Sequence, residues 1–361
     1  MKILTVLGTR PEIIRLSLVI KKLDNLCDHI LVHTGQNFDK NLSDLFFEEL
    51  NIRKPDYHLD VKGQTVGDQI GQIIQRCETV FEKENPDRIL ILGDTNSALC
   101  SIIAKRMGIP VYHMEAGNRC FEDGMPEEIN RKIIDSCSEI LLPYTHRSKE
   151  NLFREGYPSN RVYVTGNPIL EVINNYESDI KKSNILDQHN LSPQKYFLAT
   201  IHRAGNVDVE DRFNQILQSL NAAANNYDMP VIVSTHPRMR EKLKSSKDIV
   251  LDERIKLVEP FGFFDFIKLE QEAFCVLSDS GTVQEECAIF GVPNVTLRDV
   301  TERPETIDCG SNILSGAKKE DVMQAIKVVT TLKPSWIAPT EYLNQNVSDT
   351  VCRILFSVNN Q

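Results

Sequence analysis

Acidic side chains follow apolar runs in the first half of the chain. Asp94 comes just after RILIL, Glu115 comes directly after VYHM, and Glu127 lies in the later segment PEEINR. A single carboxylate in such a place is usually a helix cap or a solvated loop charge. Three at one sheet edge differ, because like charges in a cleft raise one another's pKa and provide a general acid or base near neutral pH. The group predicts proton-transfer chemistry.

Basic residues near the N-terminus could hold an anion. The first apolar run ends in GTRPE (8–12), which contains Arg10, and Arg15 follows about one turn later. Guanidinium groups and a helix N-terminus both attract phosphate. The turn lacks the G-x-G-x-x-G fingerprint of dinucleotide sites, so we do not expect an NAD cofactor. The alternative is an ordinary strand-to-helix turn with surface arginines.

The second half carries a matching set of polar residues. His202 and His236 follow apolar runs and lie close to arginines, a setting that suits phosphate better than zinc, so we expect no metal. Ser280 and Gly281 begin the helix of LSDSGTVQEE, whose backbone N–H groups can hold an anion. Glu286, one turn further on, could accept both hydroxyls of a ribose. Ordinary helix capping is the alternative for Ser280 and Gly281.

The elements that position these residues alternate along the whole chain. Short β-rich runs alternate with amphipathic stretches, a pattern typical of βαβ units around parallel sheets. Strands are expected at 2–7, 29–33, 88–92, 111–114, 140–142, 196–200, 230–235, 255–258, 274–278 and 293–297. Helices are expected at 13–23, 42–50, 65–83, 208–224, 282–290 and 342–356. The predicted fold class is α/β, with two Rossmann-like, doubly wound domains.

The length of 361 residues exceeds what one hydrophobic core usually supports. We expect an N-terminal domain over 1–165, a C-terminal domain over 166–341, and a helix near 342–361 that packs on one of them. The polar, Asn-rich and Ser-rich stretch after Tyr176 suits a linker. Doubly wound domains bind ligands at the carboxyl ends of their strands, so the two domains are expected to face a shared cleft.

The composition excludes several classes of protein. Asp plus Glu number 51 against 41 for Lys plus Arg, and a net charge of −10 repels nucleic acid and anionic lipid. Hydrophobic residues make up 41%, too many for a disordered chain. No apolar run is long enough to span a bilayer, and MKILTVLGTRPE does not read as an export leader. We therefore expect a cytoplasmic protein whose nine cysteines are reduced.

Seven motifs occur in an order that resembles a known family. They are GTRPE, GDT, H-x-EAG, PEE-x-NR, a His-Arg pair, DSG-x-x-QEE and TERPE, and they resemble the non-hydrolysing UDP-N-acetylglucosamine 2-epimerases over about residues 2 to 355. The resemblance implies the glycosyltransferase-B architecture, with a terminal helix that crosses back to the first domain. It implies interconversion of UDP-GlcNAc and UDP-ManNAc through elimination and readdition of UDP, without a cofactor. A homodimer is also expected.

The resemblance also implies roles for individual residues. The catalytic positions are matched by Asp94, Glu115, Glu127 and His202. UDP-sugar binding is expected of Arg10, Arg15, Arg131, His236, Ser280, Gly281 and Glu286. Arg15 stands where many members have Lys. Its guanidinium group can still bind phosphate, through several N–H donors in one plane rather than through the single charged nitrogen of Lys.

Several alternatives stay open from the sequence. The segments GTRPEIIRLS, HMEAGNRCF and VSTHPR resemble the branch that acts on UDP-2-acetamido-2,6-dideoxy-hexoses and makes UDP-L-FucNAc, whereas LRDVTERPE resembles the GlcNAc enzymes. A retaining glycosyltransferase would share the fold and the nucleotide seat, but the three carboxylates argue against it. A hydrolysing epimerase usually has Ala in place of Pro11. A non-catalytic UDP-sugar sensor is the fourth alternative.

Overall fold

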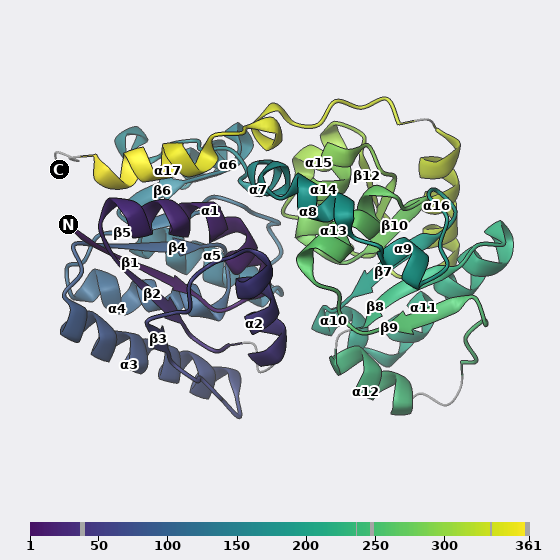
Figure 1. The fold of residues 1–361 in the computed structure, drawn as a ribbon, viewed down its shortest axis with the longest axis horizontal. Helices are drawn as coiled ribbons and strands as arrows, with labels where there is room; N and C mark the ends of the chain where they lie inside the picture. The colour runs from purple at the N-terminus through teal and green to yellow at the C-terminus, as the bar shows by residue number, and fades with distance from the viewer. Residues whose placement is uncertain (37–39, 236, 246–248, 333, 358–361) are drawn as a thin grey trace. The chain divides into compact units, whose positions relative to one another are not determined.

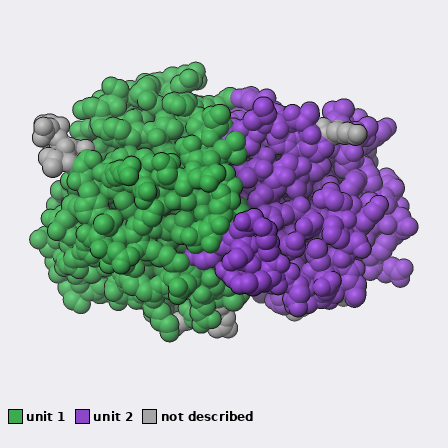
Figure 2. All heavy atoms as spheres, turned by 45° about the horizontal axis from the view of Figure 1, so that its top comes forward, with its two compact units in different colours: residues 1–175, 340–361 green, residues 176–339 purple. Residues whose placement is uncertain are grey.

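The computed structural model describes residues 1–36, 40–235, 237–245, 249–332 and 334–357. The chain forms two compact units (Figure 2). Unit 1 consists of Met1–Asn175 and Thr340–Gln361, and unit 2 consists of Tyr176–Pro339. The chain therefore begins and ends in unit 1. Within the described residues, no helix is long and apolar enough to cross a membrane.

Unit 1 is built on a sheet of six parallel strands (Figure 1). The strands run in the order β3-β2-β1-β4-β5-β6, so the strand order reverses between β1 and β4. Such a reversal is where doubly wound sheets bind ligands, at the carboxyl ends of the strands. The strands are β1 (Lys2–Leu7), β2 (Asp28–His33), β3 (Tyr57–His58), β4 (Arg88–Leu92), β5 (Val111–Met114) and β6 (Ile140–Leu142).

The helices of unit 1 cover its sheet, and their termini carry clear sequence signals. The first helix starts after Thr9, with Pro11 in its first turn and Glu12 bonded back to the Thr9 backbone N–H at 2.7 Å. The helices are α1 (Arg10–Leu26), α2 (Lys40–Glu49), α3 (Val66–Glu84), η1 (Asn96–Cys100), α4 (Ser101–Arg106), α5 (Pro126–Cys137), α6 (His146–Arg154), η2 (Ser159–Arg161), α7 (Ile169–Asn175), η3 (Thr340–Leu343) and α17 (Val347–Phe356).

Unit 2 repeats the plan with its own six parallel strands. Their order, β12-β11-β10-β7-β8-β9, places the reversal between β7 and β10. The strands are β7 (Phe197–Ile201), β8 (Val231–Thr235), β9 (Ile255–Val258), β10 (Cys275–Ser278), β11 (Asn294–Thr296) and β12 (Asn312–Leu314). The helices are α8 (Glu177–Lys182), α9 (Ile185–Gln188), α10 (Ala204–Val207), α11 (Glu210–Tyr227), α12 (Pro237–Ser245), α13 (Phe263–Gln271), α14 (Gly281–Phe290), α15 (Pro304–Asp308) and α16 (Lys319–Thr331). The predicted α/β class with two Rossmann-like units is confirmed.

Two local predictions were wrong. The stretch after Tyr176 is not an exposed linker, because α8 and α9 form there and Ile180, Ile185 and Leu191 are buried in unit 2. The terminal helix is shorter than expected, since η3 ends at Leu343 and α17 starts only at Val347. Leu343 is 40% exposed and does not share the buried face of that helix.

Candidate active site

The loop after β1 is organised by a buried glutamate. Oε2 of Glu12 accepts hydrogen bonds from the backbone N–H groups of Gly8 (3.0 Å) and Thr9 (2.7 Å). Its Oε1 accepts the hydroxyl of Thr95 at 3.0 Å, so Glu12 ties the loop after β1 to the loop after β4. Burial raises the pKa of Glu12 to about 7, although these hydrogen bonds oppose the shift. The amides of Gly8 and Thr9 are thus used internally, which leaves Arg10, half-buried at the start of α1, as the anion-binding candidate of this loop.

Gly8 is required by a close approach of side chains. A Cβ at this position would lie 2.1 Å from Oγ of Ser97 and 2.2 Å from Oγ1 of Thr34. Those two hydroxyls are hydrogen-bonded to each other at 2.7 Å. The glycine therefore lets the loops after β1, β2 and β4 meet at the strand-order reversal.

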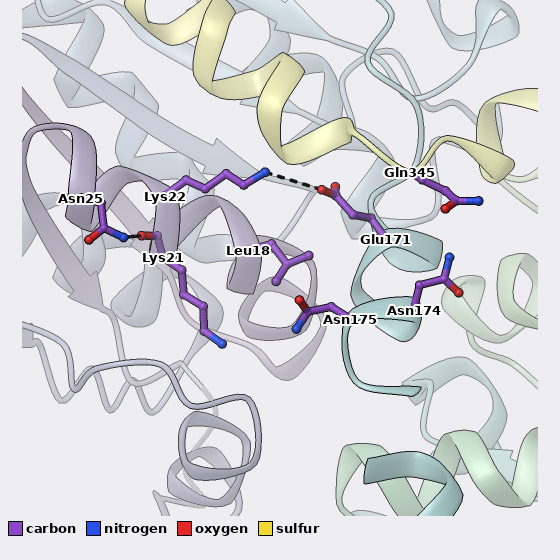
Figure 3. Close-up of a pocket in the computed structure, with 8 residues that line it drawn as sticks. All are labelled: Leu18, Lys21, Lys22, Asn25, Glu171, Asn174, Asn175 and Gln345. Carbon is purple, nitrogen blue, oxygen red and sulfur yellow. Dashed lines mark hydrogen bonds and ion pairs between the residues drawn. The ribbon is translucent and has the colours of Figure 1, made fainter. Parts of the chain in front are cut away.

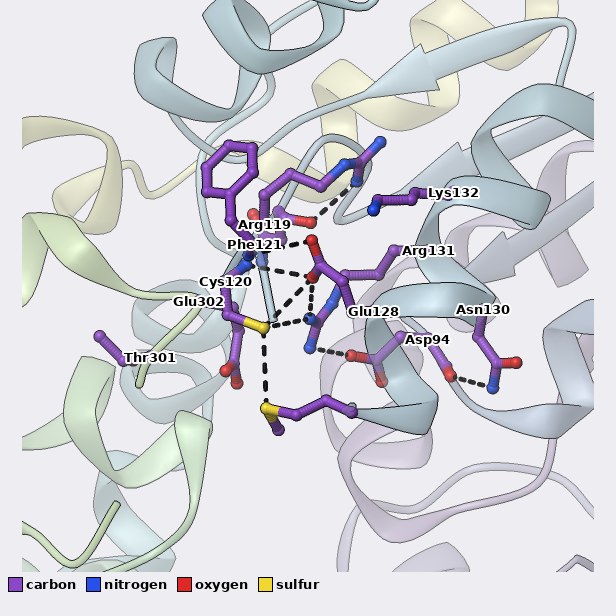
Figure 4. A network of polar contacts seen from close by, with 12 residues as sticks. Asp94, Arg119, Cys120, Phe121, Glu128, Asn130, Arg131, Lys132, Thr301 and Glu302 are labelled. Carbon is purple, nitrogen blue, oxygen red and sulfur yellow. Dashed lines mark hydrogen bonds and ion pairs between the residues drawn. The ribbon is translucent and has the colours of Figure 1, made fainter. Parts of the chain in front are cut away.

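Asp94 is held by a buried arginine on α5 (Figure 4). Nη2 of Arg131 lies 2.5 Å from Oδ2 of Asp94, and Nη1 lies 2.8 Å from Oε2 of Glu128. The backbone N–H groups of Cys120 (3.0 Å) and Phe121 (3.1 Å) also donate to Glu128. Burial raises the pKa of Glu128, but the backbone amide of Cys120 and the guanidinium group of Arg131 outweigh it and keep that pKa below its usual value. Arg131 therefore positions Asp94 and the loop at 120–121.

Glu115 follows the neighbouring strand and is also paired with arginine. Nη1 of Arg15 lies 3.2 Å from Oε2 of Glu115, and both side chains are nearly buried. Nδ2 of Asn118 donates to Oε1 at 3.2 Å. The backbone of Glu115 has φ +67°, a left-handed conformation that is costly for a residue other than glycine and is concentrated at functional sites. Since β4 pairs with β5, Asp94 and Glu115 leave adjacent strands at the same edge.

A buried ionic cluster, not foreseen from the sequence, supports this edge. Nδ1 of His113 lies 2.8 Å from Asp135, while Nε2 lies 2.8 Å from the carbonyl oxygen of Gly93. Asp135 also pairs with Arg119 at 2.7 Å and accepts the N–H of Gly117 at 3.2 Å. The cluster fixes the two loops that carry Asp94 and Glu115. The sequence gives little sign of it, because Asp135 is one of several charged residues in PEEINRKIIDSC and nothing in that pattern marks it as buried.

In unit 2, His202 is oriented by a buried aspartate. Nδ1 of His202 lies 2.9 Å from Oδ1 of Asp279, which is fully buried. The backbone N–H groups of His202 and Arg203 and the amide of Asn206 also donate to Asp279. Burial opposes ionisation, but His202 and these donors lower the pKa of Asp279 to about 2. Because Asp279 is a carboxylate, Nδ1 carries the proton in this bond and Nε2 points away from it.

The turn before α14 packs against the TERPE motif of unit 2. Ser280 is the N-cap of α14, and its hydroxyl is hydrogen-bonded to that of Thr282 at 3.0 Å. A Cβ on Gly281 would lie only 2.6 Å from Oε1 of Glu302, so the glycine is required for this contact. Glu302 is itself held by Arg298 at 2.6 Å. Since β7 and β10 are neighbours, Ser280 and His202 follow adjacent strands.

The structure thus brings Asp94 and Glu115 to one sheet edge in unit 1, and His202 and Ser280 to one sheet edge in unit 2. Within the described ranges, no cluster of three or more His, Cys, Asp or Glu side chains could hold a metal ion. His236 lies outside the described residues. Unit 1 carries Arg10, Arg15, Asp94, Glu115, Glu127 and Arg131, and unit 2 carries His202, Ser280, Gly281 and Glu286.

A separate cavity of about 480 Å³ lies elsewhere in unit 1 (Figure 3). Its lining includes none of the predicted site residues. Lys22 in this lining is already paired with Asp349 at 2.5 Å and with Glu171 at 3.8 Å. The cavity is lined by Leu18, Lys21, Lys22, Asn25, Glu171, Asn174, Asn175 and Gln345.

Comparison with known proteins places these features in a family. The family model described as UDP-N-acetylglucosamine 2-epimerase matches residues 21–356. The chain belongs to this family. A Methanocaldococcus jannaschii UDP-GlcNAc 2-epimerase, solved in complex with UDP-GlcNAc and UDP, is similar with a TM-score of 0.92 and 39% identity, covering 98% of this chain and 99% of that one. A Rickettsia bellii UDP-N-acetylglucosamine 2-epimerase is similar with a TM-score of 0.91 and 42% sequence identity, and the match covers 98% of this chain and 96% of that one.

A further relative of this epimerase family has a different named substrate. The Pseudomonas aeruginosa UDP-2,3-diacetamido-2,3-dideoxy-D-glucuronate 2-epimerase is 38% identical over 330 residues, 91% of this chain and 92% of its own. The expected class of enzyme, an isomerase that acts as an epimerase, is confirmed by these similarities. They do not favour the glycosyltransferase or the hydrolysing alternative.

Proposed function

We propose that this epimerase interconverts UDP-GlcNAc and UDP-ManNAc by eliminating and re-adding UDP. The observation that carries the proposal is the pair Asp94 and Glu115, which leave adjacent strands at one sheet edge and are each held by a buried arginine. Similarity over nearly the whole chain to an epimerase solved with UDP-GlcNAc and UDP supports the choice of substrate.

The proposed reaction breaks two bonds of the sugar. A base removes the C2 proton, the C–H electrons form the C1=C2 double bond, and the C1–O bond breaks so that its electrons leave with UDP. Readdition of UDP and protonation of the opposite face of C2 give the epimer. Asp94, Glu115 and Glu127 are the proposed acid and base groups, because proton removal and delivery on two faces need more than one group.

The proposed nucleotide site uses the remaining residues. The departing diphosphate develops negative charge, which oriented donors stabilise. His202 suits this role, because Asp279 holds its Nδ1 and the opposite ring nitrogen, Nε2, faces away from Asp279. Arg10, Arg15, His236 and the turn at Ser280 and Gly281 are the proposed phosphate donors. Glu286 is the proposed acceptor for the ribose hydroxyls.

Proton NMR of the reaction in D₂O tests this proposal. UDP-GlcNAc should yield UDP-ManNAc, and both the product and the recovered substrate should carry deuterium at C2. Interconversion without label at C2 would contradict the elimination route. The identity of the sugar is tested by parallel reactions with UDP-2,3-diacetamido-2,3-dideoxy-D-glucuronate and with the 6-deoxy-L-talose substrate of the FucNAc branch. If kcat/KM for either compound exceeds that for UDP-GlcNAc by more than about 100-fold, that compound is the substrate instead.

The setting of the enzyme is part of the same proposal. We place it in the cytoplasm as a homodimer that supplies precursors for surface polysaccharides. A nucleotide-sugar substrate and the acidic composition support this setting. Light scattering of the purified protein should give twice the mass of one chain.

A further inference from the structure

A second carboxyl group lies behind Glu286 in the core of unit 2. Glu270, near the end of α13, is fully buried, and Glu286 on α14 is 5% exposed. The two helices pack against each other, and the two carboxyl groups are within hydrogen-bonding reach. The thiol of Cys287, 3.4 Å from Oε1, is the other polar neighbour of Glu270. Within the described part of the chain, Glu270 forms no ion pair and no donor meets its Oε2.

The adjacent Glu285 shows the usual arrangement for a buried carboxylate. Its Oε1 lies 2.7 Å from Nε of Arg303, so its charge is matched by a cation. Glu286 lies on another side of α14, because consecutive helix residues do not share a face, and there it faces the carboxyl group of Glu270. The proposed reaction has so far given Glu270 no role.

Two carboxyl groups in this position must share a proton. Both are acceptors when ionised, so a hydrogen bond between them exists only if one is protonated. Burial, followed by the charge of Glu286, raises the pKa of Glu270 well above its usual value. Glu270 is the more deeply buried of the two carboxyl groups and forms no ion pair in the described part of the chain, so the proton lies on Glu270 and Glu286 is the carboxylate that accepts.

We propose that Glu270 is a positioning residue for nucleotide binding, whose neutral carboxyl group donates a hydrogen bond to Glu286 and holds the Glu286 carboxylate toward the ribose hydroxyls. The inference rests on the proposed function, in which Glu286 accepts those hydroxyls. A fixed donor at Glu270 favours one rotamer of Glu286, so less conformational freedom is lost when the nucleotide binds.

Binding of UDP and of 2′,3′-dideoxy-UDP to variants of the full chain tests the inference by calorimetry. Glu270→Met keeps the length of the side chain but removes the donor. It should weaken UDP binding about tenfold, as expected for a lost hydrogen bond to a charged group, and should change dideoxy-UDP binding less than about twofold. Equal losses for both ligands would show that Glu270 only supports the fold, and would overturn the inference.

Glu270→Gln is the matched control, because an amide is neutral, donates a hydrogen bond and has nearly the same shape. UDP binding in this variant should stay within about twofold of the wild type. A loss as large as that of Glu270→Met would mean that an ionised carboxylate is needed, and would overturn the inference.

Infrared spectroscopy tests the proton without relying on the apolar variant. The wild type at neutral pH should show the C=O stretching band of a protonated carboxylic acid that is missing in Glu270→Gln. Absence of this band from the difference spectrum would contradict a neutral Glu270.

The binding data also separate this inference from the proposed function. If the wild-type protein binds UDP and dideoxy-UDP equally, Glu286 does not hold the ribose and the inference fails. The NMR assay on the same sample decides the epimerase activity separately.

Discussion

Two neighbouring glutamates on α5 differ in their surroundings, and this difference is consistent with a proposed catalytic role for Glu127 and a structural one for Glu128. Glu127 is half-buried in the first turn of the helix, whereas Glu128 is fully buried between Arg131 and the backbone at 120–121. Nothing in the sequence PEEINR distinguishes the burial of one glutamate from that of the other. Only the structure shows that Glu128 is committed to internal hydrogen bonds, so Glu127 is the residue of the pair that we propose for proton transfer.

Glutamine variants of the two residues should therefore fail in different ways. Glu127→Gln should lower kcat about 100-fold or more with little change in melting temperature, since an amide matches the shape but cannot take a proton. Glu128→Gln should lower the free energy of unfolding by about 1 to 3 kcal/mol, because the acceptor loses its charge beside Arg131. Steady-state kinetics and urea unfolding measure both quantities. A normal kcat for Glu127→Gln would mean that this residue is only a solvated charge.

The pH dependence of stability should report Glu12. Its pKa is about 7 in the folded protein against a usual 4.5, so between these values only the unfolded chain releases the proton. Stability should therefore be highest below about pH 4.5 for this group and fall by about 3 kcal/mol as pH rises through 7. Glu12→Gln, which imitates the protonated form, should remove this decline. Urea unfolding at a series of pH values measures it, and parallel curves for the two proteins would contradict the assignment.

The pairings within the site were the part that the sequence could not show. Arg15 and Glu115 are 100 residues apart in sequence, yet they form a buried ion pair. Each was identified from its own motif, Arg15 as a phosphate donor and Glu115 as a catalytic acid. Their contact depends on how β1 and β5 are placed in the sheet, and side-chain patterns along one segment carry no information about that.

At the scale of elements, strands were easier to predict than connections. The limits of β4, β5 and β6 match the apolar runs RILIL, VYHM and ILL, because a strand buried on both faces is apolar throughout. The edge strands β3 and β12 were missed, since each spans only two or three residues and shows no period. The helices α8 and α9 were missed because their few buried side chains stand among polar ones.

The meeting of three loops at Gly8 predicts a strong substitution effect. Gly8→Ala would place a methyl group against Ser97 and Thr34, whose side chains must then move and break their mutual hydrogen bond. The free energy of unfolding should therefore fall by about 1 to 3 kcal/mol. Gly71→Ala is the control, because Gly71 lies exposed inside α3 with open space around it. That change should stabilise the protein by about 0.5 to 1 kcal/mol. Thermal unfolding compares the two, and similar effects would mean that the loops tolerate a side chain at Gly8.

At the scale of the whole molecule, the C-terminal segment returns to the unit where the chain began. The helix α17 packs on α1, with Val347, Val351 and Leu355 fully buried. Lys22 of α1 donates to Asp349 at 2.5 Å, and Arg88 donates to the carbonyl oxygen of Leu355. Unit 1 is therefore complete only when α17 has packed on α1.

Truncating one buried side chain of α17 should consequently loosen the first helix of the protein rather than unit 2. Leu355→Ala removes the apolar contacts of a fully buried side chain and should lower the free energy of unfolding by about 2 to 5 kcal/mol. Hydrogen exchange should speed up for backbone amides of α1 and α17 while those of β7 and β10 keep their protection. Arg353→Ala, on the exposed side of the same helix, should change neither. Unchanged exchange in α1 after Leu355→Ala would show that α17 adds little to the stability of unit 1.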